Sequence, residues 1–140
     1  MTGLEANKHL ARKYIQMLNA ADGDGFADMF VEDGAIIVQS PTMGLHVTRG
    51  GEAIRKLVKH LRKIFPETGL RITVDEMTAE ENRVAVTAHS DAVHVSGKAY
   101  SNRYHFLFYF KDGKVTECHE YLDSMLVNNV FFDGAQRPQS

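Results

Sequence analysis

The stretch YSNRYHFLFYFKDGKVTECHEYLDSMLVNNVF, Tyr100 to Phe131, decides the fold class of this chain. It contains two long runs of alternating pattern separated by Lys111-Asp112-Gly113-Lys114, and an Asp-Gly pair in that position predicts the tight turn of a β-hairpin. The apolar residues that follow Asp123 predict a short helix after the hairpin.

The chemistry of the two predicted strands indicates more than a packed core. Side chains alternate across a strand, so every second residue faces the same side. On the first strand that face is aromatic, with polar groups at its start: Asn102, Tyr104, Phe106, Phe108 and Phe110. On the second strand Cys118, Glu120 and Leu122 share a face, which puts a carboxylate among apolar neighbours. Such a face is typical of the wall of a small-molecule cavity.

Composition limits the function classes. The chain has 140 residues, 44% of them apolar and 24% charged, with a net charge of −2, as expected for a single globular, soluble domain over residues 1–140 with a loose tail from Gly134 to Ser140. This balance gives no electrostatic reason to expect nucleic acid or a membrane as partner. The single cysteine and the absence of a signal-like or membrane-spanning apolar run favour the cytoplasm.

Hydrophobic periodicity predicts helices first and a sheet afterwards. The expected helices are Glu5 to Ala20, a short one capped by Asp24 that carries Phe26, Met29 and Phe30, and one that starts after Gly50-Gly51 and ends at Pro66 and Gly69. A short strand, Ala35 to Gln39, and a loop, Thr42 to Arg49, precede the third helix. The later strands are expected at Leu70 to Met77, Arg83 to Val95, Ala99 to Phe110 and Lys114 to Asp123. This order predicts an α+β domain with a curved antiparallel sheet.

Three segments carry a family resemblance: KYIQMLNAADGDGFADMFVEDGAIIVQSP, GGEAIRKLVKHL and FKDGKVTECHEYLD. They resemble the nuclear-transport-factor-2-like superfamily, in its SnoaL-like and ketosteroid-isomerase-like branch, over Leu10 to Phe131. The resemblance implies a cone: a strongly bent sheet that wraps around the three N-terminal helices and leaves an internal apolar cavity open at one end. Members include isomerases, polyketide cyclases, limonene epoxide hydrolase and non-catalytic binding or dimerisation domains, so the fold alone does not give the function.

The resemblance to limonene epoxide hydrolase suggests the acid–base residues. Asp91 and His89 lie two residues apart in TAHSDAVHV, where that family has an acid and an arginine, and Glu120 matches its second carboxylate. If all three point inward, His89, Asp91 and Glu120 are the predicted catalytic groups. Desolvation and mutual repulsion would separate the pKa values of the two opposed carboxyl groups, Asp91 and Glu120, so that one can donate and the other accept a proton. The alternative places His89 and Asp91 on the solvent face, and a bulge would reverse the parity.

The remaining candidates bind or polarise a substrate. Tyr14 matches the helical segment that carries the oxyanion-hole tyrosine of ketosteroid isomerase, a worked case of tuned carboxyl groups, and is either a catalytic hydrogen-bond donor or a core residue. Gln39 stands near the position of that enzyme's base, and it is not a base, which disfavours a simple steroid isomerase. The predicted substrate-binding residues are Asn102, Tyr104, Gln39, Phe106, Cys118 and Phe30. His46 is expected at the cavity mouth or in solvent, and no metal-ligand spacing such as HExxH or CxxC is present, so no metal or cofactor is predicted.

Two classes of function follow, with one variant. The first is a cofactor-free isomerase or lyase acting on a small hydrophobic oxygenated molecule, with a limonene-type epoxide hydrolase as its variant. The second is a non-catalytic binding or dimerisation module. The discriminating feature is whether Asp91 and Glu120 face each other inside the cavity, because the module is favoured if either faces water. A homodimer is expected through the outer sheet face that carries Arg103, His105, Leu107 and Tyr109.

Overall fold

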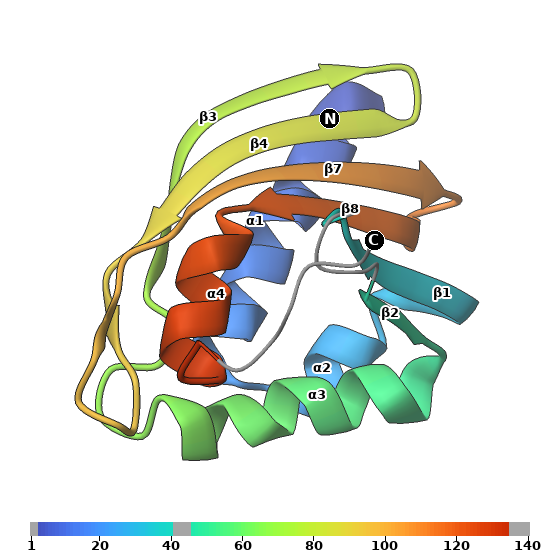
Figure 1. Cartoon of the computed structure of the whole chain (residues 1–140). Helices are drawn as coiled ribbons and strands as arrows, with labels where there is room; N and C mark the ends of the chain where they lie inside the picture. Colours follow the sequence, from blue (N-terminus) through green and yellow to red (C-terminus); the bar gives the residue numbers. More distant parts are fainter. Residues whose placement is uncertain (1–2, 41–45, 135–140) are drawn as a thin grey trace.

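The computed structural model describes residues 3–40 and 46–134, and its helices and strands follow the predicted order (Figure 1). The helices are α1 Gly3–Ala20, α2 Gly23–Ala27, α3 Gly51–Ile64 and α4 Ser124–Phe131. The strands are β1 Phe30–Val38, β2 His46–Arg49, β3 Ile72–Glu80, β4 Arg83–Ser90, β5 Ala92–Val93, β6 Ala99–Tyr100, β7 Arg103–Lys111 and β8 Lys114–Leu122. The predicted α+β class with one curved sheet is confirmed.

The main sheet is built around the predicted hairpin. Its strand order is β2-β1-β8-β7-β4-β3. The prediction of a wholly antiparallel sheet is wrong at one place, because β1 is parallel to β8, while the other neighbours are antiparallel. At the turn between β7 and β8, Asp112 and Gly113 have φ angles of 49° and 78°. Two successive residues in the left-handed region suit the twist of a two-residue hairpin turn, which explains the Asp-Gly pair.

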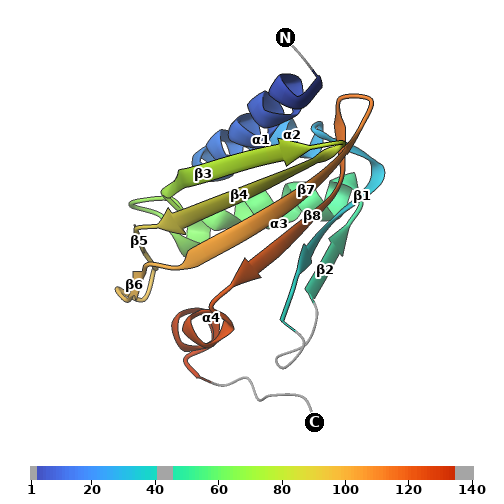
Figure 2. The ribbon, with the colours of Figure 1, turned by 90° about the horizontal axis from the view of Figure 1, so that it is seen from above.

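The helices occupy the concave side of the sheet. Figure 1 shows the strands curving over α1, with α3 running across the open side below them, and Figure 2 shows the same strands lying across these helices from above. The inner positions of β7, from Tyr104 to Phe110, are buried. Tyr14 of α1 packs on this aromatic row, with ring centroids 4.7 Å from Phe108 and 4.4 Å from Phe26. No helix in the described part of the chain is long and apolar enough to cross a membrane.

Several element boundaries differ from the sequence prediction. Asp22, not Asp24, caps α2, because its side-chain oxygen accepts a hydrogen bond from the Gly25 amide at 3.0 Å. Phe30 lies at the start of β1 and not in a helix, and part of the predicted loop forms the edge strand β2. The predicted loop residues 42–45, and the predicted tail after Gly134, lie outside the described residues.

The largest difference concerns the predicted strand Arg83 to Val95. β4 ends at Ser90, and the chain then turns away from the main sheet, where β5 and β6 pair with each other as a small separate hairpin. The predicted strand Ala99 to Phe110 is divided in the same way, since Ser101 and Asn102 separate β6 from β7. This hairpin lies at one end of the sheet, next to α4 (Figure 1).

Candidate functional site

A cavity of about 350 Å³ lies between the concave face of the sheet, α3 and α4. Its walls are mostly aliphatic and aromatic, with contributions from both halves of the chain. The polar side chains that line it are few: Glu120, Tyr100, Tyr104, Ser40, His46, Thr48 and Ser124. A mainly apolar cavity with a few polar groups is the usual form of a small-molecule site, as the alternation in β7 and β8 predicted.

Glu120 is the carboxylate of this cavity. It lies on β8 between Val38 of β1 and Phe106 of β7, its neighbours in register. No hydrogen bond or ion pair joins its carboxyl group to another described residue, and burial raises its pKa from 4.5 to about 7. The prediction that Glu120 faces an apolar cavity is therefore confirmed. A carboxyl group with such a pKa can both accept and donate a proton near neutral pH.

Tyr14 and Cys118 lie in the core and not on the cavity wall. Both are fully buried, and neither lines the cavity. The Tyr14 hydroxyl has no hydrogen-bonded nitrogen or oxygen partner among the described residues, and the Cys118 thiol interacts with it. Burial raises the pKa of both groups, with Glu120 adding to the effect, so both are neutral near pH 7. The fold supports the core alternative for Tyr14 and gives Cys118 no thiolate character.

His89 and Asp91 do not point into the cavity, so that expectation is wrong. The inward positions of β4 belong to Val84, Val86 and Ala88, which leaves His89 on the outer face. There the His89 Nδ1 lies 2.8 Å from an Asp75 carboxylate oxygen. Asp91 is exposed beyond the end of β4, where its backbone carbonyl accepts a hydrogen bond of 2.6 Å from the Arg71 guanidinium.

The predicted substrate-binding residues are divided between the cavity wall and its surroundings. Tyr104 and Phe106 line the cavity, with their rings stacked at a centroid distance of 5.1 Å. Phe30 is buried in the aromatic core, 5.9 Å from the Tyr14 ring. Gln39 is half-buried and does not line the cavity, although its backbone N–H donates to the Glu120 backbone carbonyl at 2.7 Å.

Asn102 is buried beside the cavity and does not line it. Its side-chain oxygen accepts hydrogen bonds from the backbone amides of Arg103 and Asp123, at 2.8 and 2.9 Å. Its side-chain nitrogen donates to the Tyr100 hydroxyl at 3.0 Å and to the Asp123 carbonyl at 3.2 Å. These four bonds use all the hydrogen-bonding capacity of the Asn102 side-chain amide. The prediction that Asn102 contacts the substrate directly is therefore wrong.

Sequence reasoning missed Tyr100 as a cavity residue and treated His46 as a minor candidate. Both line the cavity, His46 from the edge strand β2 and Tyr100 from the short strand β6. A signal for Tyr100 was present, because it has the same parity as Asn102 and Tyr104 in the sequence.

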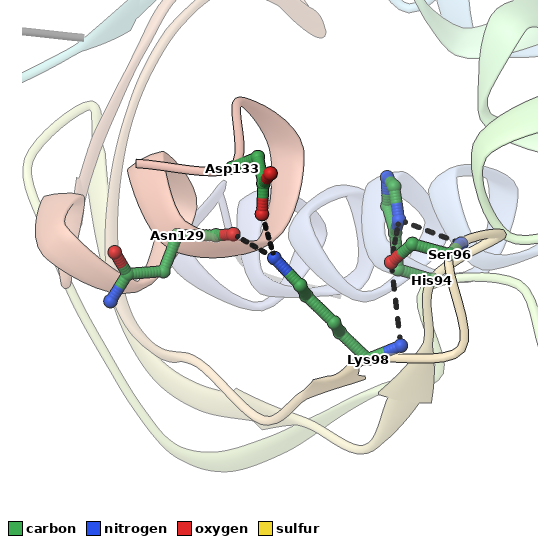
Figure 3. Close-up of polar contacts among 5 residues, drawn as sticks. All are labelled: His94, Ser96, Lys98, Asn129 and Asp133. Carbon is green, nitrogen blue, oxygen red and sulfur yellow. Dashed lines mark hydrogen bonds and ion pairs between the residues drawn. The ribbon is translucent and has the colours of Figure 1, made fainter. Parts of the chain in front are cut away.

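The helix α4 forms part of the cavity wall, to which it contributes Ser124, Val127 and Phe131. Figure 3 shows how the β5–β6 hairpin holds this helix: the Lys98 ammonium donates to the Asn129 carbonyl at 2.8 Å and to the Asp133 carboxylate at 2.6 Å. A cation at the C-terminal end of a helix also favours its dipole. The cavity wall therefore depends on a contact between segments that are far apart in sequence.

No group of three or more potential metal-ligating side chains occurs within residues 3–40 and 46–134. The lining groups that can take part in chemistry on a bound molecule are the Glu120 carboxyl, the hydroxyls of Tyr100 and Tyr104, and the smaller hydroxyl and imidazole groups of the wall.

Comparison with known proteins gives one family match: a model of the SnoaL-like domain matches residues 11–118. Among solved structures, a candidate isomerase from Bacillus subtilis has 18% identity and a TM-score of 0.78, over 99% of this chain and 100% of that one. A candidate SnoaL-like polyketide cyclase from Jannaschia has 21% identity and a TM-score of 0.71, over 93% and 94%.

A third similar structure is that of TerC, co-crystallised with polyporic acid, with 15% identity and a TM-score of 0.75 over 91% of this chain and 98% of that one. Identities this low show a shared fold and no more. A comparison with curated protein sequences finds no match.

Proposed function

We propose that this chain, which belongs to the SnoaL-like domain family, is an isomerase or lyase that moves a proton on a small, hydrophobic, cyclic or aromatic oxygenated molecule. The observation that carries the proposal is the Glu120 carboxyl group, which lines an apolar cavity and has a pKa near 7. The chemistry uses side chains alone, and no cofactor is part of it.

A single carboxyl group is enough for this chemistry. As a carboxylate, Glu120 removes a proton from a carbon next to a carbonyl group, and the electron pair moves onto the carbonyl oxygen. The protonated Glu120 then returns the proton to another carbon, which completes an isomerisation, or to a departing hydroxyl group, which leaves as water and completes an elimination. A pKa near the working pH favours both steps, and general acid–base catalysis of this kind contributes about 10²- to 10⁴-fold.

Epoxide hydrolysis of the limonene type has less support. That reaction uses two opposed acids to activate water and protonate the epoxide, and Asp91, the residue proposed for the second acid, is exposed outside the cavity. Proton transfer by Glu120 alone agrees better with a cavity wall in which Glu120 supplies the carboxyl group.

A non-catalytic binding module is the second candidate, and the position of Asp91 outside the cavity favours it. Asp91 and Glu120 do not face each other, which is the outcome expected for a module. The cavity of a module would bind the same class of molecule without changing it. Against this, an unpaired carboxyl group in an apolar cavity is costly to keep for binding alone.

A homodimer and a reducing compartment are also part of the proposal. Arg103, His105, Leu107 and Tyr109 lie on the outer face of β7, and Leu107 and Tyr109 are half-buried there. We propose that this face joins two copies of the chain in a reducing compartment such as the cytoplasm. Light scattering of the purified protein, beside Leu107→Asp, would report a monomer for both if the dimer is wrong.

The test of the enzyme is a turnover screen read by mass spectrometry. Purified, chelator-treated protein is incubated with cyclic enones, aromatic diols, polyketide-like phenols and terpenoid epoxides. Glu120→Gln removes the proton carrier and keeps the shape, and Asp91→Asn is the matched control. Conversion by the wild type and Asp91→Asn, reduced at least 10²-fold in Glu120→Gln, supports the enzyme. Compounds that bind to all three proteins and come back unchanged support the module.

A further inference from the structure

We propose that the Tyr100 hydroxyl is the donor that binds the oxygen of a neutral carbonyl ligand in this cavity, and that Asn102 is the residue that points it there. The inference deepens the proposed function and rests on it for the place of the ligand. It follows from the directions of the hydrogen bonds around Tyr100, which can be assigned one proton at a time.

The orientation of the Asn102 amide is fixed. Two backbone amides, of Arg103 and Asp123, point at one side-chain atom, and only an oxygen can accept from both. The other atom is therefore the nitrogen, and its bond to the Tyr100 hydroxyl oxygen, 3.0 Å long, has Asn102 as donor. Tyr100 accepts this bond, so its own proton must go elsewhere.

The protons of Ser90 and Tyr104 can be placed in the same way. The Ser90 hydroxyl oxygen accepts from the Asn102 backbone amide at 2.9 Å, and its single proton goes to the Tyr100 carbonyl oxygen at 3.2 Å. Ser90 can therefore only accept from Tyr104. The contacts of the Tyr104 hydroxyl are long: 3.5 Å to Ser90 and 3.3 Å to the Tyr100 hydroxyl.

Tyr104 is the donor in its contact of 3.3 Å with the Tyr100 hydroxyl, so none of these groups accepts a short hydrogen bond from the Tyr100 proton. Hydrogen bonds between hydroxyl groups are usually 2.5–3.0 Å long, so a contact of 3.3 Å is weak. A ligand oxygen in the cavity can offer Tyr100 a shorter bond, after which Tyr104 keeps its long contacts. The bond from Asn102 also polarises the Tyr100 hydroxyl and strengthens it as a donor, because hydrogen bonds in a chain reinforce one another.

The surroundings select the class of ligand. Burial is the main cause of the raised pKa values of Tyr100 and Tyr104, and the charge of the nearby Glu120 adds to it. A negatively charged ligand beside the tyrosines would therefore meet repulsion from the Glu120 carboxylate. The remaining wall is mostly apolar, with Phe106 stacked on Tyr104. A neutral cyclic ketone or enone satisfies both conditions: it presents an acceptor to Tyr100 and a hydrocarbon ring to the wall.

The test compares two ligands of one shape, 1-indanone and indane, which differ by the carbonyl oxygen. Their dissociation constants are measured by NMR titration of the wild type, Tyr100→Phe, Tyr104→Phe and Asn102→Asp, with the exposed Tyr121→Phe as matched control. The ratio of the two constants reports the carbonyl contact, and indane affinity reports the integrity of the cavity. Infrared spectra of ¹³C-labelled 1-indanone give a second readout, because a hydrogen bond lowers the carbonyl frequency.

We expect Tyr100→Phe to reduce the preference for 1-indanone over indane about tenfold, with indane binding unchanged. The shift of the carbonyl frequency in bound 1-indanone should also disappear in this variant. Asn102→Asp should lose the same preference, because its carboxylate would accept the Tyr100 proton. Tyr104→Phe and Tyr121→Phe should keep it. An undiminished preference in Tyr100→Phe, or a loss in Tyr104→Phe instead, would overturn the assignment, as would a wild type that binds neither ligand or prefers indane. A ketone contact through Tyr100 without turnover of any substrate would keep this inference and reject the enzyme.

Discussion

The strongest quantitative prediction concerns Glu120→Gln, which should make the protein more stable than the wild type at neutral pH. The glutamine keeps the shape of the side chain and cannot ionise. In the wild type the carboxyl group has a folded-state pKa of about 7 and an ordinary value of 4.5. Between these two pH values the folded chain holds a proton that the unfolded chain has released.

The sign and size follow from proton linkage. The free energy of unfolding changes by 1.36 kcal/mol per pH unit for each proton that differs between the two states. Because the folded state binds the extra proton, the wild type loses stability as the pH rises from about 4.5 and stops losing it above about 7. The interval of about 2.5 units, from 4.5 to 7, gives at most about 3 kcal/mol; water that enters the cavity would reduce it.

The assay is urea denaturation of both proteins at half-unit steps from pH 4.5 to 8.5, followed by far-UV circular dichroism. The difference in free energy of unfolding, variant minus wild type, should rise through pH 5 to 7 and then stay constant. Glu76→Gln, a change at an exposed carboxylate of β3, is the matched control and should give no such rise. A pH-independent difference for Glu120→Gln, or one that falls with pH, would refute the buried, unpaired carboxyl group.

The remaining predictions concern Tyr14, Lys98 and Asp91. Tyr14→Phe removes a buried hydroxyl without a nitrogen or oxygen partner, so stability in urea should stay within about 1 kcal/mol of the wild type or rise; a loss above about 2 kcal/mol would mean that the hydroxyl is well bonded. Lys98→Met removes the bonds that hold α4, so hydrogen exchange should accelerate in α4 and not in β7, and equal protection would contradict the clamp. Asp91→Asn should leave ligand affinity and any activity unchanged, and a tenfold loss in calorimetry or rate assays would return Asp91 to the site.

Alternation in the sequence predicted the hairpin and its inner face well. Every second residue from Asn102 to Phe110 is buried, and Glu120 and Leu122 line the cavity. Local pattern succeeds here because the face of a strand depends on parity and the turn depends on two residues.

For β4, the same alternation rule and the family resemblance point in opposite directions. Val84, Val86 and Ala88 are apolar at alternate positions, which places His89 outward without any structure. The resemblance of His89 and Asp91 to the arginine and acid of limonene epoxide hydrolase implied instead that both side chains point inward. The end of β4 at Ser90 could not be predicted in the same way, because it depends on the distant Arg71, whose side chain and carbonyl hold the Asp91 backbone.

Parity also does not separate a cavity wall from a packed core. Cys118 and Glu120 share a face of β8, yet Cys118 is covered by Tyr14 of α1, while Glu120 lines the open space between the sheet, α3 and α4. The difference is set by which helix lies over each residue, and that depends on contacts between distant parts of the chain. For the same reason Asn102 was predicted to contact the substrate and Tyr100 was missed. The Asn102 side-chain amide is saturated by the Arg103 and Asp123 backbone and by the Tyr100 hydroxyl, while Tyr100 lines the cavity.

The most direct test of the central claim, that Glu120 moves protons on a bound carbonyl compound, is hydrogen–deuterium exchange at carbon. Cyclic ketones and enones are incubated in D₂O with wild type, Glu120→Gln or Asp91→Asn, and mass spectrometry follows deuterium at the carbon next to the carbonyl group. We predict incorporation above the buffer rate with wild type and Asp91→Asn, and the buffer rate with Glu120→Gln. Ketones that bind to the wild type and exchange only at the buffer rate, or exchange equally with Glu120→Gln, would contradict the account.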